Sequence, residues 1–383
     1  MQWMVPERRL DESQLAILRE CGSLRGDNDW IQGFAGSGKT VLLVHLVRRI
    51  LAQHSGASLC VATYTHALKD LIGTGFEDEF RDHVPVLTYH QFLNDSRRYD
   101  VVLLDEVQDI PQADLMRIRK LAGRLVVAGD TDQSIYERGS GAQELQHVLA
   151  PRTHPLAVIH RLTQRIKDLV RTILPHSLIE SAPTGRMQDV QVILAKAESA
   201  NQETGWVWEQ CKRYAKQGNP VVVLLPTHKR IQHFMRCVCA LEGKDAPMFP
   251  LRQPQGKGVD YEPANEFLDT ESVPLRYLGN NFGSLLESDH RPLTYVMTYH
   301  SAKGLDFETV IIPELNEGTW FWKDEDIARR LFFVACSRSR KNLFLSYSAS
   351  RPHEYVQAMP QELLKHSACV LPRDQGEDAE LFF

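Results

Sequence analysis

The chain has 383 residues, of which 43% are hydrophobic and 24% are charged, and its formal net charge is −5. This length accommodates two or three domains with cores of their own, and the composition excludes a largely disordered chain. The negative balance argues mildly against a large nonspecific nucleic-acid footprint, but it leaves room for a local basic groove.

No segment of the sequence predicts a membrane span or a secretory signal. The longest apolar runs, such as Val221–Leu225, have the length of a strand and not the roughly 18 to 20 residues that cross a bilayer. The first residues lack the apolar stretch of a signal peptide. The seven cysteines are scattered, and only Cys237 and Cys239 are close together. We therefore expect a cytoplasmic protein with reduced thiols and no membrane partner.

Residues 1–150 alternate short apolar runs with helical stretches. The predicted strands lie at 30–31, 59–62, 101–104 and 125–128, and the predicted helices at 39–52, 67–72 and 112–121. This alternation is typical of a parallel sheet with helices on both faces, and it predicts a first α/β domain over residues 1–150.

A second α/β domain is predicted over residues 151–350. Its expected strands lie at 221–225, 295–298, 310–312 and 343–346, and its expected helices at 206–216 and 326–337. Residues 244–292 are rich in proline and predict a loop-rich insertion rather than a core element. Residues 351–383 form a C-terminal extension with an acidic tail, which is either a frayed or self-packed terminus or a docking peptide.

The strongest motif is Gly33–Thr40, which fits G-x-x-x-x-G-K-[ST] between a predicted strand and an amphipathic helix. Glycines let such a loop turn its N–H groups toward phosphate oxygens, and the helix start adds a positive dipole. Lys39 is expected to reach the β- and γ-phosphates of ATP, and Thr40 to ligate Mg²⁺. The residues expected to hold the nucleotide here are Gly33, Gly36, Ser37, Gly38, Lys39 and Thr40. The alternative is a flexible Gly-Ser loop before a helix.

Two adjacent carboxylates follow the predicted strand at 101–104. In α/β sheets, ligands bind at the carboxyl ends of the strands. We therefore expect Asp105 and Glu106 to lie at the ligand-binding edge of the sheet. We expect Asp105 to hold Mg²⁺ and Glu106 to polarise the attacking water. The alternative is that the two carboxylates lie on an ordinary solvated turn and bind no metal.

The order of the motifs resembles that of superfamily 1A helicases of the Rep, UvrD and PcrA type. Residues 105–109 resemble the D-E-x-Q-D box of that family, and residues 10–14 its adenine-reading Q-motif. Residues 129–136, 299–308 and 330–339 resemble motifs III, V and VI. The resemblance spans about residues 10–348. It implies two RecA-like P-loop NTPase domains with parallel sheets, with ATP in the interdomain cleft.

The resemblance also implies roles for residues outside the phosphate loop. Gln133 is expected to sense the γ-phosphate, and Arg161 and Arg338 to reach across the cleft to it, because a guanidinium meets phosphate oxygens bidentately. As an alternative, each arginine is a surface ion-pair partner.

Four further residues are expected to contact the nucleoside. Gln14 stands in the Q-motif, and His160 stands where the family has a tyrosine that stacks on adenine, so nucleotide choice is expected to be looser. Gly304 and Asp306 lie in the segment that resembles motif V, with Asp306 where the family has a ribose-contacting glutamate.

Residues 63–66 and 88–92 resemble motifs Ia and Ic of the family, which face the nucleic-acid strand. Aromatic stacking on bases tolerates any sequence, as a translocase requires. The residues expected to contact nucleic acid are Tyr64, Thr65, Thr88, His90, Tyr136 and His300. The alternative is that Tyr64 and Tyr89 are core or rim aromatics.

The family's inserted subdomains are largely missing, which leaves close to a bare two-domain core. One hypothesis is an ATP-dependent translocase that moves 3′ to 5′ on single-stranded DNA, or on RNA, as a motor beside a nuclease in repair or antiphage defence. A second is an ATP-gated binding switch that regulates a partner. A third, a degenerate scaffold, predicts that Lys39→Ala changes nothing.

Overall fold

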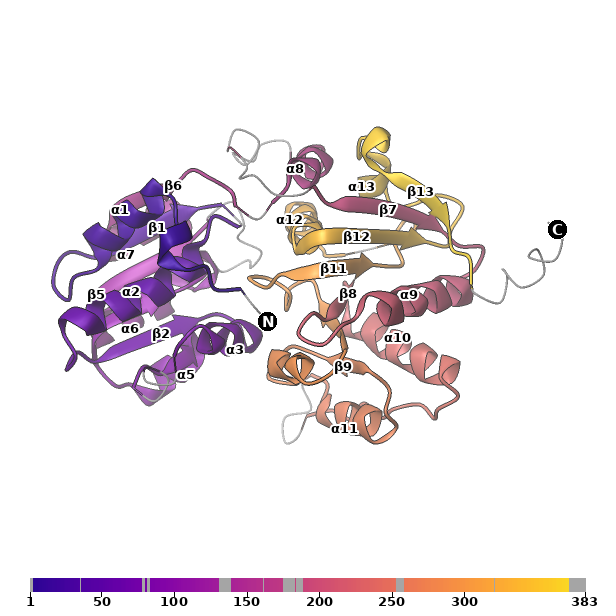
Figure 1. The fold of residues 1–383 in the computed structure, drawn as a ribbon, viewed down its shortest axis with the longest axis horizontal. Helices are drawn as coiled ribbons and strands as arrows, with labels where there is room; N and C mark the ends of the chain where they lie inside the picture. The colour runs from indigo at the N-terminus through magenta and orange to yellow at the C-terminus, as the bar shows by residue number, and fades with distance from the viewer. Residues whose placement is uncertain are drawn as a thin grey trace. The chain divides into compact units, whose positions relative to one another are not determined.

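The computed structural model describes residues 3–34, 36–77, 80, 83–130, 139–160, 162–174, 183, 189–252, 258–319 and 321–371. The chain divides into two compact units. We call Gln2–Leu162 with His176–Met187 the N-terminal unit, and Thr163–Pro175 with Gln188–Phe383 the C-terminal unit. Each unit is built on its own parallel sheet with packed helices (Figure 1), which confirms the predicted α/β fold class.

The N-terminal unit contains a six-stranded parallel sheet in the order β3-β2-β4-β5-β1-β6. Its strands are β1 Asp29–Gly33, β2 Leu59–Thr63, β3 Val86–Thr88, β4 Tyr99–Leu104, β5 Ala122–Gly129 and β6 Arg152–Leu156. Its helices are α1 Glu12–Cys21, α2 Lys39–Gln53, α3 His66–Thr74, α5 Tyr89–Asp95, α6 Gln112–Leu121 and α7 Ala142–Leu149, with 3-10 turns η1 Glu7–Arg9 and η2 Val107–Asp109. One face of the sheet packs on α5, α6 and α7 through a shared apolar cluster.

The first sheet continues past residue 150, where the sequence predicted the domain boundary. Strand β6 pairs in parallel with β1, from Asp29 opposite Arg152 to Gly33 opposite Leu156. Only His154 and Leu156 of this edge strand are buried, so it lacks the continuous apolar run that marks the central strands. The compact unit ends at Leu162 instead.

The C-terminal unit contains a seven-stranded parallel sheet in the order β13-β7-β12-β11-β8-β10-β9. Its strands are β7 Gln191–Lys196, β8 Val221–Leu225, β9 Leu275–Tyr277, β10 Thr294–Thr298, β11 Phe307–Ile312, β12 Ser339–Tyr347 and β13 Lys365–Ala368. Its helices are α8 Gln164–Arg171, α9 Ala200–Tyr214, α10 His228–Leu241, α11 Glu262–Thr270, α12 Glu325–Cys336 and α13 Glu354–Gln357, with 3-10 turns η5 Leu285–Asp289 and η6 Gln361–Leu363. None of the described helices combines the length and apolar character that crossing a bilayer demands.

The proline-rich segment 244–292 contributes to the second core, contrary to the sequence-based expectation. It contains α11 and β9, and the buried rings of Tyr261 and Tyr277 stack 3.6 Å apart. Asn265 binds both main-chain polar groups of Tyr277. Pro263 lies in the first turn of α11, where the missing N–H breaks no helical bond, so it does not interrupt the helix.

The predicted C-terminal extension is also partly incorporated in the fold. Strand β13 pairs with β7 along Lys365–Ala368, so the second sheet extends beyond residue 350. The acidic tail from residue 374 onward lies outside the described residues.

Candidate nucleotide site

The loop between β1 and α2 has the backbone that the phosphate-loop motif requires. Gly36 and Gly38 have φ angles of 77° and 89°, in the left-handed region that favours glycine. Gly38 is the N-cap of α2, and a Cβ added to it would lie 2.6 Å from Nε2 of Gln14. Any side chain at position 38 would therefore be both strained and obstructed.

Positive charge and a polar side chain are buried within this loop. Lys39 is buried, and its Nζ donates to the carbonyl oxygens of Gly33 at 2.7 Å and Phe34 at 3.0 Å. The hydroxyl of Ser37 is buried and has no hydrogen-bond partner among the described residues. An unpartnered hydroxyl, an ammonium group and the start of α2 together fit a polyphosphate anion.

The predicted metal ligands meet in the structure. Oγ1 of Thr40 donates to Oδ2 of Asp105 at 2.6 Å, which joins the phosphate loop to the end of β4. Asp105 is fully buried, and this burial, followed by the charge of Glu106, raises the pKa of Asp105 to about 6. A divalent cation stabilises such a carboxylate in its ionised form, and carboxylate and hydroxyl oxygens are ligands that suit Mg²⁺.

Glu106 is positioned by a residue to which the sequence alone assigned no separate role. Glu106 has a φ of 53°, an unusual backbone for a non-glycine residue. Nε2 of the buried Gln108 donates to Oε2 of Glu106 at 2.5 Å, and Oε1 of Gln108 accepts from the main-chain N–H of Asp130 at 3.0 Å. Gln108 thus ties the carboxylate of Glu106 to the end of β5. Its place in the D-E-x-Q-D box was the only signal available in the sequence.

Replacing Gln108 with methionine is expected to lower kcat for ATP hydrolysis by about 10- to 100-fold, because a misplaced catalytic group costs about that much. The side chain keeps its length but loses both hydrogen bonds. Nucleotide affinity, measured by titration with a non-hydrolysable analogue, should stay unchanged. An equal loss of affinity would assign Gln108 to loop stability instead.

Replacing Asp105 with asparagine is expected to stabilise the protein at neutral pH without metal or nucleotide. Because the pKa of Asp105 in the folded protein is raised to about 6, ionisation of this carboxyl lowers the free energy of unfolding. This cost is absent below about pH 4, where the carboxyl is protonated in both states, and complete above about pH 6. The shift corresponds to about 3 kcal/mol, or a rise in Tm of roughly 6 to 12 °C.

Thermal unfolding in EDTA at pH 7.5 and again near pH 4.5 tests this expectation, with the exposed Asp95→Asn as control. The advantage of Asp105→Asn should shrink at the lower pH. A gain that is independent of pH would rule out burial of charge as its cause.

Two residues expected near the nucleoside lie against the phosphate loop. Nε2 of Gln14 donates to the carbonyl oxygen of Ser37 at 3.0 Å. The main-chain N–H of His160 donates to the carbonyl oxygen of Gly36 at 2.9 Å. The structure therefore brings Gln14 and His160 to the same loop. Gln133, Tyr136 and Arg161 lie outside the described residues.

Arg338 is packed within the C-terminal unit. It is 1% exposed, and its guanidinium donates to the carbonyl oxygens of Val334 and Leu305 at 2.8 and 3.1 Å and to Oγ of Ser337 at 2.8 Å. Its main-chain oxygen accepts from the N–H of Phe307. Arg338 thus lies against the segment that holds Gly304, whose φ is 82°, and Asp306.

Four predicted strand-binding residues, Tyr64, Thr65, Thr88 and His90, lie at the carboxyl ends of β2 and β3, which are neighbours in the sheet. Thr65 and Thr88 cap α3 and α5, since their hydroxyls accept from the N–H groups of Leu68 and Gln91. The ring of Tyr64 stacks 5.4 Å from that of Tyr89. Tyr89 is buried, so it is a core aromatic, as one of the two interpretations held.

The two histidines differ in their surroundings. His90 is exposed, and its ring lies 3.9 Å from the ring of Tyr89. Burial, followed by the charges of Lys303 and His228, lowers the pKa of His300 to about 4, so its ring is neutral at physiological pH. His300 would therefore contact a ligand by stacking or hydrogen bonding and not by charge.

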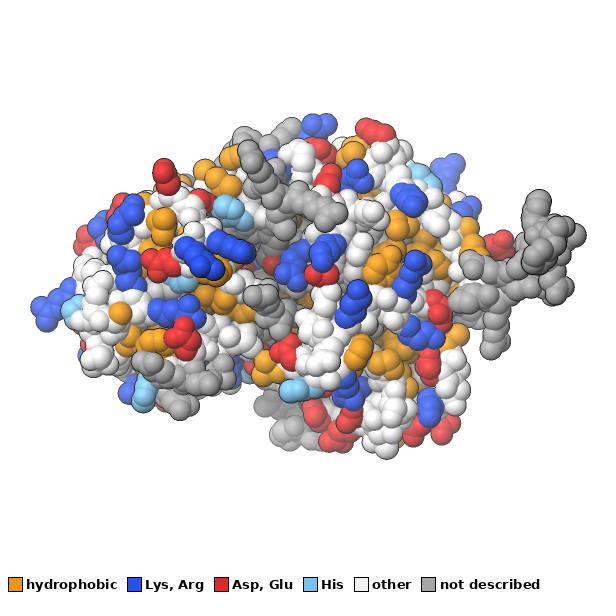
Figure 2. Space-filling view, in the orientation of Figure 1, with side chains coloured by type: hydrophobic (Ala, Val, Ile, Leu, Met, Phe, Trp, Pro, Cys, Tyr) orange, Lys and Arg blue, Asp and Glu red, His pale blue; other side chains and the backbone are white. Residues whose placement is uncertain are grey.

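Charged side chains of both signs are interspersed on the face of each unit shown in Figure 2. This mixture matches the net charge of −5. On this face, such a mixture suits local contacts with a strand better than a broad electrostatic footprint.

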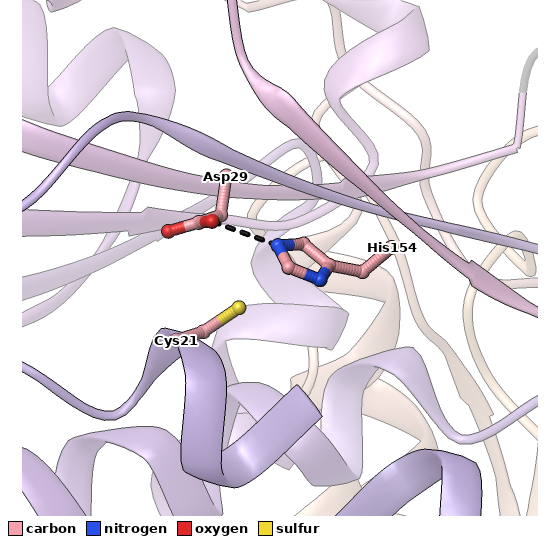
Figure 3. A group of neighbouring side chains, drawn as sticks. All are labelled: Cys21, Asp29 and His154. Atoms are coloured by element: carbon pink, nitrogen blue, oxygen red, sulfur yellow. Dashed lines mark hydrogen bonds and ion pairs between the residues drawn. The ribbon is translucent and has the colours of Figure 1, made fainter. Parts of the chain in front are cut away.

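A second polar cluster lies at the other end of the N-terminal sheet, where β1, β5 and β6 begin (Figure 3). Oδ1 of the buried Asp29 accepts from Nε2 of His154 at 2.7 Å and from Nε of Arg152 at 3.1 Å. Its Oδ2 accepts from the buried guanidinium of Arg124. The thiol of Cys21 lies beside Asp29 and His154.

The spacing of Cys21, Asp29 and His154 would admit a metal ion, but their chemistry does not favour one. Two guanidinium groups already neutralise Asp29. Burial, followed by the charge of Asp29, raises the pKa of Cys21 to about 12, so this residue is a protonated thiol when no metal is bound. The cluster is a structural brace. No local pattern predicts this cluster, because Asp29 and His154 are 125 positions apart.

Comparison with known proteins finds helicases in both halves of the chain. Residues 30–217 match the model of the viral superfamily 1 RNA helicase core domain. Residues 281–350 match the model of the UvrD-like helicase C-terminal domain. Each of these models covers less than half of the chain.

The curated relatives are DNA helicases. The chain is 26% identical over 117 residues to DNA helicase II of Rickettsia typhi, a match to 28% of this chain and 17% of the relative. It is 33% identical over 105 residues to the ATP-dependent DNA helicase PcrA of Leuconostoc citreum, covering 23% and 14%. It is 35% identical over 86 residues to the ATP-dependent DNA helicase Rep of Buchnera aphidicola, covering 18% and 13%. The matches thus span about a sixth or less of these relatives.

Among solved structures, the Arterivirus nonstructural protein 10 helicase has a TM-score of 0.45 and 15% identity over 89% of this chain and 63% of its own. The complex of that helicase with DNA gives a TM-score of 0.41 and 14% identity over 86% and 62% of the two chains.

Proposed function

We propose that the chain, which matches superfamily 1 helicase models in both of its halves, is an ATP-hydrolysing translocase on single-stranded nucleic acid. The observation that carries the proposal is the bond between Thr40 and Asp105. It joins a phosphate loop holding a buried lysine to a carboxylate pair in which Gln108 orients Glu106. One unit thereby contains groups whose chemistry suits the binding of a triphosphate and the activation of water.

In this proposal the loop N–H groups, Lys39 and the hydroxyl of Ser37 bind the phosphates. Thr40 and Asp105 hold Mg²⁺, which offsets phosphate charge when it is bound. Glu106, fixed by Gln108, accepts a proton from the attacking water.

Three further residues act on the γ-phosphate in this proposal. Gln133 senses it, and Arg161 and Arg338 stabilise the charge that develops on it. For Arg338 this requires the guanidinium to exchange its carbonyl partners, which lie within its own unit, for phosphate oxygens.

We propose that the protein moves along single-stranded DNA in the 3′-to-5′ direction. RNA is the alternative substrate. The residues assigned to the strand are Tyr64, Thr65, Thr88, His90, Tyr136 and His300. The N-termini of α3 and α5, which follow neighbouring strands, support this assignment because helix starts attract phosphates.

The test is steady-state ATP hydrolysis with no strand and with DNA or RNA strands of increasing length. A translocase should be stimulated, and the stimulation should grow with length before it levels off. Displacement of streptavidin from strands biotinylated at one end or the other reports the polarity. An absence of hydrolysis under all conditions would refute the proposal.

A second candidate is an ATP-gated switch that regulates a partner such as a nuclease in cytoplasmic repair or antiphage defence. The net charge of −5 and the mixed charges on the face shown in Figure 2 favour it, because movement along a strand usually relies on a basic surface. Hydrolysis that no strand stimulates, together with a co-purified nuclease whose activity depends on ATP, would support the switch.

A further inference from the structure

We infer that Trp322, together with His300, holds one unpaired base of the bound strand by stacking. The inference deepens the proposed function and rests on it. It adds the loop between β11 and α12 to the segments that contact the strand.

Two segments of the C-terminal unit meet through a buried pair of aromatic rings. Tyr299 follows β10 and is 1% exposed, and Phe321 lies in the loop between β11 and α12 and is 3% exposed. Their ring centroids are 5.6 Å apart in an edge-to-face arrangement, which is a favourable geometry for aromatic rings. This inner pair fixes the position of each segment relative to the other.

Further contacts anchor Phe321 in the core. Its ring stacks on that of Phe332 in α12 at 5.6 Å and on that of His353 at 4.4 Å. Nε2 of the buried His353 lies 2.9 Å from the carbonyl oxygen of Thr319, in the same loop as Phe321. The loop is therefore held in place immediately before Trp322.

The next residue of each segment contributes to a second, outer pair. The ring centroids of His300 and Trp322 lie 4.8 Å apart, with an angle of 58° between the ring planes. Both side chains are half-buried, so part of each ring stays accessible to a ligand. Because the inner pair anchors both segments, the outer rings would lose little conformational freedom when a ligand binds.

The chemistry of the outer pair suits a base better than a phosphate group. The indole of Trp322 is uncharged, and the lowered pKa of His300 leaves its imidazole neutral at physiological pH. Lys323 directly follows Trp322 and is exposed, so it can meet a phosphate beside the stacked base. Aromatic rings with an adjacent cation are typical of sites that bind single-stranded nucleic acid without sequence preference.

Two acidic residues that follow Lys323 have partners within the unit. Asp324 caps α12, since its carboxylate accepts from a main-chain N–H of the first turn. Glu325 accepts from the hydroxyl of Tyr355 at 2.8 Å and pairs with Arg329 at 3.0 Å. The start of the helix and Arg329 partly offset these two charges, which therefore repel a nearby phosphate less than free carboxylates would.

The experiment measures the Kd for a labelled deoxythymidine strand of about 12 nucleotides, and for the same sugar-phosphate strand without bases, by fluorescence anisotropy. Trp322→Ala should weaken binding of the thymidine strand about tenfold, the contribution of one stacked base. Its Kd for the abasic strand should stay within about twofold of the wild-type value, since that strand has nothing to stack. Leu286→Ala, which shortens an exposed apolar side chain of the same unit, is the control and should bind both strands as the wild type does.

Equal weakening of both strands by Trp322→Ala would overturn the inference, because it indicates structural damage or a lost phosphate contact. Unchanged binding of the thymidine strand would overturn it as well. A wild-type protein that neither binds the thymidine strand nor is stimulated by it would instead refute the proposed function.

Tryptophan fluorescence provides a second test that remains informative if Trp322→Ala unfolds in a thermal melt. A base that stacks on an indole quenches its emission, so the thymidine strand should quench the wild type more than the abasic strand does. Trp322→Phe, which keeps an aromatic ring beside His300, should remove this difference. A difference that persisted in Trp322→Phe would place the stacked base on another tryptophan.

Discussion

Replacing Lys39 with alanine should lower kcat for ATP hydrolysis by about 100- to 1,000-fold, the usual cost of removing a group that stabilises transition-state charge. Lys39 lies under the phosphate loop, where Gly33 and Phe34 hold its Nζ through their carbonyl oxygens. Its loss removes a positive charge from the buried base of the loop and releases both carbonyl groups. Steady-state phosphate release measures the rate.

The matched control is Lys120→Ala, at an exposed position in the last turn of α6. That variant should hydrolyse ATP as the wild type does. Thermal melts of both variants separate lost chemistry from lost folding. A Lys39→Ala protein that retained the wild-type rate would contradict a catalytic phosphate loop and revive the hypothesis of a degenerate scaffold.

Replacing Asp29 with alanine should reduce the free energy of unfolding by about 3 to 5 kcal/mol, the typical cost of leaving one partner of a buried ion pair unpaired. Arg124 is only 2% exposed and would lose its charged partner, and His154 would lose a hydrogen bond. Urea unfolding followed by circular dichroism measures the loss.

Arg152→Ala is the control for the brace, because Arg152 binds the same carboxylate but is 49% exposed. An exposed partner of this kind should contribute less than about 1 kcal/mol. If Asp29→Ala were no more destabilising than Arg152→Ala, the brace would have no special energetic role. Changing Asp29 to leucine and Arg124 to methionine together should restore part of the loss. Arg124 also donates to the carbonyl oxygens of Asp27 and Cys21, which limits the recovery.

Central strands and the phosphate loop could be predicted because their signals are local. Strand β8 was predicted at its observed bounds, since five consecutive apolar residues form a strand buried on both faces. The loop and the carboxylates were predicted from spacing that reflects their chemistry.

The elements that escaped prediction depend on distant partners. Strand β6 alternates exposed and buried residues and contains Pro155, and β13 is exposed throughout, so neither shows an apolar run. The contacts of Asp29 with Arg124 and His154 span 95 and 125 positions, and no local pattern encodes such pairs. The orientation of Glu106 by Gln108 also required the end of β5 to be placed in space.

Strand β13 covers the edge of the second sheet, so its removal is expected to affect the solubility of truncated forms of the protein. It is the outermost strand next to β7, and its four residues are exposed. A polar outer strand that carries lysine discourages neighbouring molecules from adding strands to the sheet. Deleting residues from 365 onward would uncover the more apolar β7, and we expect such shortened chains to self-associate by edge-to-edge pairing.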